Sequence, residues 1–385
     1  MAKIKMIICD GGVTKDFFDV RPQKECEFLL KQGHDVEVLI LYRDEDRNIP
    51  FKTQINDIEC IFLNCRGKIT DWLAKGILKD KNNLLYPLWF MIFLFKLKCY
   101  LNNNPADFLH THNLYATFAG SLVRSKNQKI VFDMREFFGM QGDRGILSAI
   151  KKRVSKYLCY QSDKILYVHP LQKEEAPRET QHKFLHLPNY PDTDHIFPLT
   201  KKRTTNDPLY ISYIGGIRER QKDFFEILAK ACAEVGDVKL SLHGGGNGYP
   251  EVRYLQEKYP DVVRVPGPYD GVKDTARLFS ECDLLYCCYD MSVINWRRAE
   301  PTKMFEAIAT QTPFIISQGA YVEAFVVEKG IGYVLNAGNY EEVLLFIKHV
   351  KNNRMDLNTI AVNIGEIMER YTWDTVVQVL NEAYA

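Results

Sequence analysis

Strand-like and helix-like segments alternate along this chain, and that alternation is the feature that most constrains its fold. The apolar runs Ile4 to Cys9 and Val36 to Leu41 flank a stretch of helical periodicity that ends near Gln32 and Gly33. A strand, a helix and a second strand in succession indicate neighbouring parallel strands. The sequence therefore predicts an α/β fold built on parallel sheets.

The same rhythm occurs twice, with a linker between the two series. Residues 187–207 are polar, hold three prolines and lack periodicity, which is typical of a linker. Before it we predict further strands at Ile61 to Leu63, Phe108 to His110, Ile130 to Phe132 and Ile165 to Val168. After it we predict strands at Leu209 to Ile214, Val238 to His243, Val262 to Val265, Leu284 to Cys288, Pro313 to Ile316 and Tyr333 to Leu335.

A chain of 385 residues exceeds the usual size of one hydrophobic core. We therefore predict two Rossmann-like domains that face a cleft. Residues 1–190 form the N-terminal domain and residues 191–370 the C-terminal domain.

The charge balance argues against nucleic acid as a partner. The net charge is only +1, although Lys151, Lys152, Arg153 and Lys156 form a local basic cluster. Such a cluster favours an anionic surface, such as that of a membrane, as a partner. The chain opens directly with a strand-like run rather than a secretory leader, so we expect a cytoplasmic protein, peripheral at the inner face of the membrane if it binds there. The ten cysteines show no C-x-x-C spacing and are expected to be reduced core residues.

The most hydrophobic segment runs from Leu84 to Phe95. Its twelve residues before Lys96 are too few to cross a hydrocarbon layer of ~30 Å as a helix. A buried core helix is the favoured interpretation. The alternative is an interfacial patch that dips into a bilayer beside the basic cluster.

Ligands of open parallel sheets bind beyond the carboxyl ends of the strands, which selects three loops of the N-terminal half. Gly11 and Gly12 follow the first strand and would let an acceptor or a phosphate approach the backbone. Two later strands end in His110-Thr111-His112-Asn113 and in Asp133-Met134-Arg135-Glu136. We expect these loops to face the second domain, although either histidine is as readily a core residue. No third ligand stands at zinc-site spacing, so we expect no metal.

Three segments of the C-terminal half suit a nucleotide. Gly215 and Gly216 precede Arg218, Arg220 and Lys222 at the start of a helix, an arrangement that suits a diphosphate; the alternative is a solvated basic turn. The loop His243-Gly244-Gly245-Gly246-Asn247-Gly248 is expected to pass close to a ligand, with a flexible surface turn as the alternative. It matches neither a P-loop nor a dinucleotide fingerprint.

The third segment is Glu300-Pro301-Thr302-Lys303-Met304-Phe305-Glu306, where a helix begins at Thr302. Lys303 and Glu306 lie three residues apart on one helical face. A cation for phosphate and a carboxylate for ribose hydroxyls would then point the same way. A surface ion pair is the alternative, and such pairs contribute little to stability.

Taken together, these segments resemble the GT-B glycosyltransferases, most closely the retaining glycosyltransferase family 4 group used in bacterial polysaccharide and glycolipid assembly. Asp133-Met134-Arg135-Glu136 is similar to the family's D-x-H-E, and Pro301 to Glu306 is similar to its P-N-K-x-x-E. Tyr371-Thr372-Trp373-Asp374 resembles the start of a C-terminal segment that returns to the first domain in the family. The resemblance thus implies that residues 371–385 pack on the N-terminal domain.

The resemblance implies transfer of a sugar from a nucleotide-sugar donor to a saccharide or lipid-linked acceptor, with retained anomeric configuration and without a metal or other cofactor. Catalytic roles would belong to His112 at the transferred sugar and to Arg218 and Lys222 at the diphosphate. Donor contacts would come from Gly215, Gly216, His243, Gly244, Gly245, Arg298, Thr302, Lys303 and Glu306. The acceptor side would comprise Gly11, Gly12, His110, Asp133, Arg135 and Glu136.

Arg298 stands where many family members carry a glutamate, which alters the contact to the sugar. Two alternatives therefore stay open: a nucleotide-sugar epimerase of the same fold and a catalytically silent subunit that binds nucleotide sugars. A nicotinamide oxidoreductase ranks last, because no G-x-G-x-x-G follows the first strand.

Overall fold

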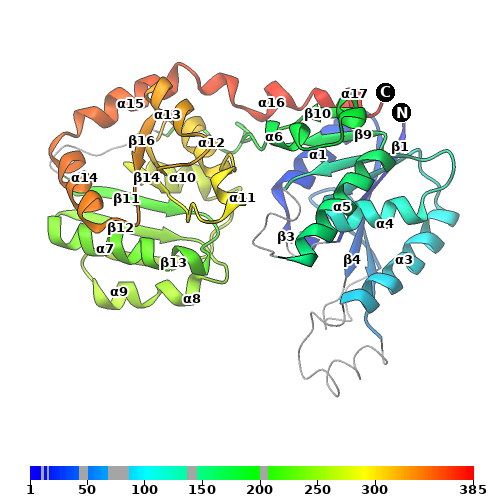
Figure 1. Ribbon diagram of the computed structural model, residues 1–385, viewed down its shortest axis with the longest axis horizontal. Helices are drawn as coiled ribbons and strands as arrows, with labels where there is room; N and C mark the ends of the chain where they lie inside the picture. The colour runs from blue at the N-terminus through cyan, green and yellow to red at the C-terminus, as the bar shows by residue number, and fades with distance from the viewer. Residues whose placement is uncertain (10–12, 15–16, 43–50, 68–85, 137–144, 200–206) are drawn as a thin grey trace. The chain divides into compact units, whose positions relative to one another are not determined.

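The computed structural model describes residues 1–9, 13–14, 17–42, 51–67, 86–136, 145–199 and 207–385 (Figure 1). The chain divides into two compact units. Unit 1 comprises Met1–Pro188 together with Val377–Ala385, and unit 2 comprises Asn189–Val376. The last residues of the chain thus belong to the same unit as the first.

Unit 1 is built on an eight-stranded sheet with the order β10-β9-β8-β7-β1-β4-β6-β5. Its strands are β1 (Lys3–Ile8), β4 (Asp35–Tyr42), β5 (Lys52–Ile55), β6 (Ile58–Asn64), β7 (Phe108–His112), β8 (Lys129–Met134), β9 (Lys164–Tyr167) and β10 (Phe184–His186). All neighbours run parallel except β5, which pairs antiparallel with β6. A separate short pair joins β2 (Val13–Thr14) to β3 (Phe17–Phe18).

Helices cover both faces of this sheet. On one face, α3 (Tyr86–Asn103) and α4 (Asn113–Val123) share a core with Ile7 of β1. On the other face, Cys26 of α1 (Val20–Lys31) contacts Met6. The remaining helices of the unit are α5 (Ile146–Gln161), α6 (Pro170–Glu174), the 3-10 helix η2 (Arg178–Lys183) and α17 (Val379–Ala383).

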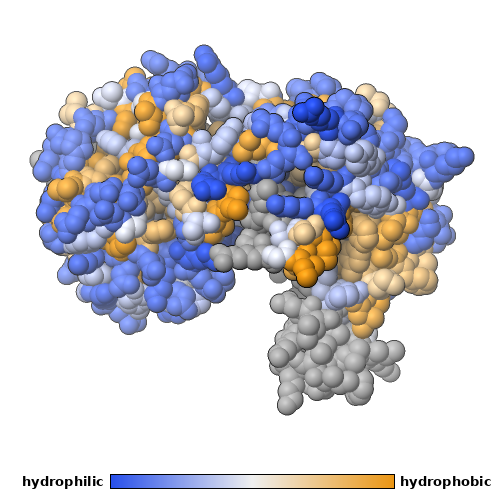
Figure 2. All heavy atoms as spheres, in the orientation of Figure 1, coloured by the Kyte–Doolittle hydropathy of each residue, from blue (hydrophilic) through white to orange (hydrophobic). Residues whose placement is uncertain are grey.

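Helix α3 contains the very hydrophobic segment, apart from Leu84 and Leu85, which lie outside the described residues. Trp89, Phe93, Leu97 and Leu101 are buried in the core of unit 1, as the favoured interpretation predicts. Leu88, Met91 and Phe95, however, are 37%, 64% and 71% exposed. The core interpretation is therefore right for one face of α3 and wrong for the other. Figure 2 shows apolar side chains gathered over the α3 and α4 region. None of the helices among the described residues is long and apolar enough to cross a membrane.

Unit 2 is built on six parallel strands with the order β13-β12-β11-β14-β15-β16. They are β11 (Leu209–Ile214), β12 (Val238–His243), β13 (Val263–Gly267), β14 (Leu284–Cys287), β15 (Phe314–Ser317) and β16 (Gly332–Leu335). One face packs against α7 (Lys222–Val235) and α14 (Tyr340–Asn352). The other packs against α10 (Thr275–Ser280), α12 (Thr302–Ala309), α13 (Glu323–Lys329) and α15 (Met355–Gly365).

Shorter segments complete unit 2: η3 (Glu219–Gln221), α8 (Tyr249–Val252), α9 (Tyr254–Lys258), α11 (Ile294–Arg297), η4 (Met368–Arg370) and α16 (Trp373–Val376). The two sheets confirm the predicted α/β class with two Rossmann-like parallel sheets. The six strands predicted after the linker all exist: β11 and β12 have the predicted bounds, and the ends of the other four shift by one or two residues.

Candidate functional site

The two glycine-rich loops of unit 2 pack against each other at the carboxyl ends of β11 and β12. The Ile217 amide donates a hydrogen bond of 2.7 Å to the carbonyl oxygen of Gly245. A Cβ atom on Gly244 would lie 1.9 Å from the carbonyl oxygen of Gly215, and one on Gly246 would lie 2.4 Å from that of Ile217. Both glycines have positive φ, at 140° and 120°. Glycine is therefore required here by contact between the loops, a reason that the sequence did not reveal.

Gly215 also leaves room for the ammonium group of Lys303. A Cβ atom at Gly215 would lie 2.5 Å from Nζ of Lys303. That ammonium lies 3.6 Å from the ring centroid of Tyr213 and 5.5 Å from that of Tyr289. Lys303 is only 9% exposed, so the alternative of a surface ion pair is wrong for it. A buried cation held on aromatic rings is suited to pairing with an anion.

Helix α12 begins directly beside this ammonium. Pro301 precedes its first residue, and no side chain caps its first turn. The free N–H groups and the helix dipole favour an anion at this end. Thr302 is exposed at the same end, and Glu306 is half-buried one turn later.

Gln221 holds the loop after β11 in place. Its buried side chain accepts a hydrogen bond of 3.0 Å from the Arg218 amide and donates one of 3.3 Å to the carbonyl oxygen of Cys288. The Tyr213 hydroxyl donates to the carbonyl oxygen of Gly216 at 2.7 Å. Neither Gln221 nor Tyr213 was singled out from sequence, because a buried glutamine or tyrosine carries no motif of its own.

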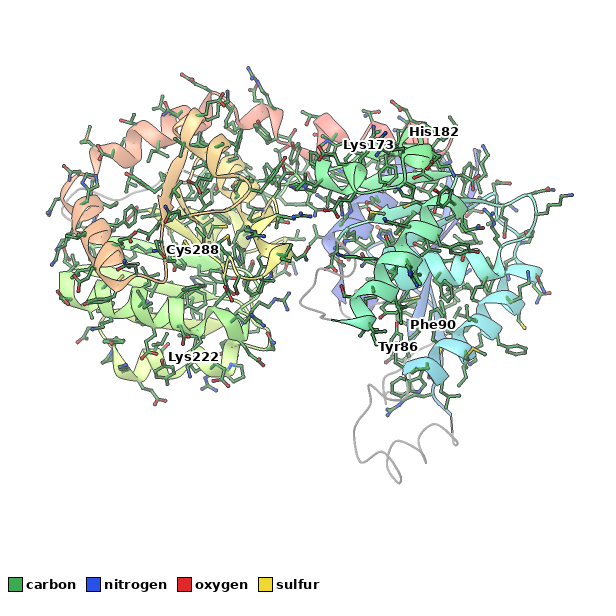
Figure 3. The ribbon with its side chains drawn as sticks, in the orientation of Figure 1. Tyr86, Phe90, Lys173, His182, Lys222 and Cys288 are labelled. Atoms are coloured by element: carbon green, nitrogen blue, oxygen red, sulfur yellow. The ribbon has the colours of Figure 1, made fainter. Side chains whose placement is uncertain are left out.

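The three cations of that loop have different surroundings. Arg218 is exposed, and a Cβ atom on Gly216 would lie 3.9 Å, an ordinary van der Waals distance, from its guanidinium group. Arg220 pairs with Asp290 at 3.5 Å. Lys222 pairs with Glu251 of α8 at 3.8 Å and lies 5.8 Å from the Tyr254 ring of α9; Figure 3 shows Lys222 near these helices. The structure thus brings Arg218 and Lys303 to the glycine turn, whereas the contacts of Lys222 are with α8 and α9.

Glu300, which opens the third predicted segment but was given no role there, stands immediately before Pro301 at the start of α12. Burial raises the pKa of its carboxyl group to about 7. The predicted donor residue Arg298 ends the short helix α11 two residues earlier. A carboxylate next to a Pro-Thr helix start is the signal that could have identified Glu300. We missed it because it stands outside the spacing of the family motif.

The predicted histidines of unit 1 lie in a buried ionic network. His110 and His112 are 0% and 1% exposed, and their rings stack with centroids 4.7 Å apart. Nε2 of His110 lies 3.1 Å, and that of His112 3.5 Å, from Oε2 of Glu25. Nδ1 of His112 lies 2.9 Å from Asp133. On its other side, Nδ1 of His110 contacts the hydroxyl of Tyr384.

Arg21 supplies the permanent positive charge of this network. Its guanidinium donates to both oxygens of Asp133, at 3.0 and 2.7 Å, and lies 3.1 Å from Oε1 of Glu25. Burial alone would raise the pKa of Asp133, but Arg21 and His112 outweigh it and hold that pKa well below its usual range. Burial lowers the pKa of His110.

These contacts correct one expectation. His110, His112 and Asp133 are not open loop residues, because they lie in β7 and β8 and pair with side chains of α1. Glu25 and Asp133 also bring their ligand atoms within 4.8 Å of those of the histidines, a proximity that the sequence spacing did not reveal. The expectation that no metal is bound stays a prediction. A direct role of His112 in catalysis stays a prediction.

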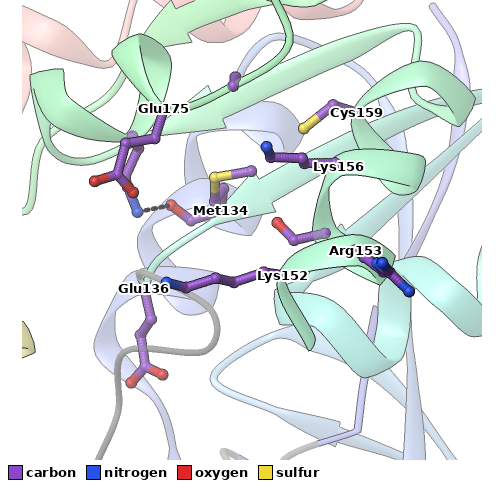
Figure 4. A pocket seen from close by; sticks show the side chains of 10 residues that line it. Met134, Glu136, Lys152, Arg153, Lys156, Cys159 and Glu175 are labelled. Carbon is purple, nitrogen blue, oxygen red and sulfur yellow. Dashed lines mark hydrogen bonds between the residues drawn. The ribbon is translucent and has the colours of Figure 1, made fainter. Parts of the chain in front are cut away.

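Two of the other predicted acceptor-side residues of unit 1, Arg135 and Glu136, lie among the described residues. Arg135 donates to Asp19 at 2.6 Å, and Gly11 and Gly12 lie outside the described residues. Glu136 lines a pocket of about 390 Å³ next to α5 (Figure 4). The pocket is lined by Met134, Glu136, Lys152, Arg153, Ser155, Lys156, Cys159, Gln172, Glu175 and Ala176.

Comparison with solved structures identifies this fold. Sucrose-phosphate synthase from Thermosynechococcus elongatus matches with a TM-score of 0.77 and 16% identity, over 100% of this chain and 98% of that one. HepE of Anabaena, in complex with UDP-glucose, matches with a TM-score of 0.70 and 13% identity, over 100% and 99% of the two chains. The chain has the GT-B fold.

A third GT-B structure, the apo form of the lipopolysaccharide outer core galactosyltransferase WaaB, has a TM-score of 0.62 and 14% identity, with 99% of each chain covered. By sequence, no family model matches the chain, and no curated protein does either. At these identities the likeness concerns the fold, so the activity has to be argued from the site.

Proposed function

We propose that this GT-B protein is a glycosyltransferase that takes its sugar from a nucleotide-sugar donor bound by unit 2. The observation that carries the proposal is the buried Lys303 ammonium beside the glycine turn and the N-terminus of α12. These three features supply a fixed cation, close backbone approach and free N–H groups, which together suit a diphosphate. HepE, a structure of the same fold, is known in complex with UDP-glucose.

The proposed reaction breaks the bond between the sugar and the diphosphate and forms a bond from the sugar to a hydroxyl oxygen of the acceptor, with retained configuration. The hydroxyl proton passes to the leaving nucleoside diphosphate. Negative charge grows on the leaving diphosphate during this step. Lys303, Arg218 and the start of α12 would stabilise that charge without reorganisation, and such preorganised stabilisation is usually the largest single contribution to catalysis. Because protein cations and dipoles do this work, we propose that the reaction needs no metal. Glu306 would bind the ribose hydroxyls.

The acceptor is proposed to be a saccharide or a lipid-linked saccharide, and an anionic membrane surface is proposed as a partner. Exposed apolar side chains of α3 and the basic cluster of α5 support the membrane proposal. Hydrophobic residues beside cations favour binding at the interface of an anionic bilayer.

Thermal unfolding tests the donor site. A ligand that binds only the folded state raises the melting temperature, so we expect one nucleoside diphosphate of a panel to stabilise the protein. Lys303→Met keeps the buried stem and removes the charge. It should weaken the binding of that nucleoside diphosphate by at least about tenfold, or ~1.4 kcal/mol. Lys273→Met is the matched control, since the Lys273 side chain is 83% exposed. Equal nucleotide affinity in both variants would refute the proposed donor site.

Release of nucleoside diphosphate, measured with and without an acceptor, then distinguishes the enzyme classes. A transferase consumes the nucleotide sugar only when an acceptor is present, whereas an epimerase that works by eliminating nucleoside diphosphate from the sugar releases it without one. Nucleotide binding with no turnover over a broad acceptor panel would identify a silent binding subunit. Activity that survives exhaustive chelation would support the proposal that no metal is needed.

A further inference from the structure

We infer that the pocket beside α5 in unit 1 binds a phosphate or diphosphate group of the acceptor, an inference that rests on the proposed transferase function. Met134, the last residue of β8, forms part of its wall. The pocket therefore lies at the carboxyl edge of the sheet, where open parallel sheets bind ligands. Figure 4 shows Lys152 and Lys156 extending from α5 toward the side of Met134 and Glu136, whereas Arg153 extends the other way.

The positive charge of α5 favours binding of an anion. Its sixteen residues include four cations and no aspartate or glutamate. Lys152 and Lys156 are separated by four residues, a like-charge spacing that destabilises an isolated helix by a few tenths of a kcal/mol. They do not lie in the last turn, so the helix dipole does not offset this cost. Among the described residues, no ion pair joins Lys152, Arg153 or Lys156 to a carboxylate.

The floor of the pocket is neutral and rigid. The buried Gln172 side chain donates to the carbonyl oxygen of Met134 at 3.0 Å and accepts from the amides of Val168 and His169 at 2.9 Å. Burial raises the pKa of the Cys159 thiol to about 12, so it stays uncharged at neutral pH. Two carboxylates, Glu136 and Glu175, also line the pocket but are outnumbered by the three cations. A compact anion of high charge, such as a phosphate, suits this balance.

A second face of α5 indicates that the phosphate belongs to an amphiphile. Ile146, Ile150 and Tyr157 are 81%, 51% and 49% exposed. They repeat at i, i+4 and i+11 with Arg153 at i+7, which places all four on one stripe of the helix. This stripe lies next to the face that carries Lys152, Lys156 and Cys159. An acceptor with a phosphate head and an apolar chain would contact both faces.

Two probes test the pocket on the full-length protein. Calorimetric titration with inorganic pyrophosphate should show two binding steps, one at the pocket and one at the glycine turn of unit 2. The variant Lys152→Gln/Lys156→Gln should lose the first step, with affinity at least about tenfold lower. Lys303→Met should lose the second. The control Lys31→Gln/Lys126→Gln removes the same charge from exposed positions of unit 1 outside the pocket and should keep both steps.

Cosedimentation with phosphatidylcholine vesicles that contain phosphatidic acid identifies the source of the phosphate. If Lys152→Gln/Lys156→Gln loses binding to both pyrophosphate and these vesicles, the acceptor presents its phosphate on a lipid. If it loses pyrophosphate while the wild-type protein ignores the vesicles, the acceptor is a free phosphorylated saccharide. Unchanged pyrophosphate binding in a pocket variant with a wild-type melting temperature would overturn the inference. If the pocket variant loses its binding step while Lys303→Met binds pyrophosphate as the wild-type protein does, the pocket inference stands and the proposed donor site is refuted.

Discussion

At the scale of single residues, burial decides the chemistry of both units. Glu300 and Lys303 are close in sequence, yet one is a carboxyl group with a pKa raised to about 7 and the other an ammonium held on aromatic rings. Their residue types were visible in the sequence, and Lys303 was selected from its motif. Their burial was not visible, because it depends on Tyr190, Tyr213 and Tyr371, which come from distant segments.

We predict that Glu300→Gln stabilises the protein at pH 8 and leaves its stability unchanged near pH 4. The folded-state pKa of about 7 exceeds the ordinary value of 4.5, so the fold binds the proton more tightly than the unfolded chain does. The wild-type protein therefore loses stability as the pH rises from 4.5 to 7, by at most about 3 kcal/mol. Melting temperatures at both pH values measure this difference. Glu328→Gln, at a side chain 73% exposed, should show no such pH dependence.

At the scale of elements, hydrophobic periodicity predicted the buried central strands and missed an exposed edge strand. The central strands were predictable because runs such as Lys3–Ile8 are buried on both faces and therefore continuously apolar. The edge strand β5 was missed, since its residues Lys52–Ile55 alternate between exposed and half-buried and carry little apolar signal. The network around His110 was missed because Arg21 and Glu25 were not singled out: they stand four residues apart on α1, and ion pairs at this spacing are usually exposed.

The exposed face of α3 leads to a prediction at the same scale. Met91 and Phe95 are separated by four residues and lie on one exposed face. We expect Met91→Gln/Phe95→Gln to reduce cosedimentation with vesicles of phosphatidylcholine and phosphatidylglycerol by at least about threefold, since each buried apolar side chain contributes ~1.5–3 kcal/mol to transfer from water.

The control for α3 is Val327→Gln/Leu345→Gln, which removes apolar side chains 63% and 65% exposed on unit 2. It should bind vesicles as the wild-type protein does. Equal loss in both double variants would show that vesicle binding has no specific surface.

At the scale of the whole molecule, the chain leaves unit 1 at Pro188 and returns to it at Val377. The returning segment is tied in by Leu380 and Tyr384, which are 0% and 8% exposed. The Tyr384 ring packs edge-on against Phe108, with centroids 5.1 Å apart, and its hydroxyl contacts His110. Unit 1 thus depends on residues that follow all of unit 2, so it cannot be completed until residues 377–385 have been synthesised.

We therefore predict that Tyr384→Ala destabilises unit 1 and leaves nucleotide binding by unit 2 intact. Removing a buried aromatic side chain costs about 3–5 kcal/mol. The same change leaves Nδ1 of His110 without its hydroxyl partner in a buried site, which adds to the cost. Calorimetry should show the transition of unit 1 at lower temperature, while the transition that a bound nucleotide shifts stays in place. Tyr157→Ala, at a ring 49% exposed, should move neither transition. One transition that falls as a whole in Tyr384→Ala would instead show that the two units unfold as one cooperative body.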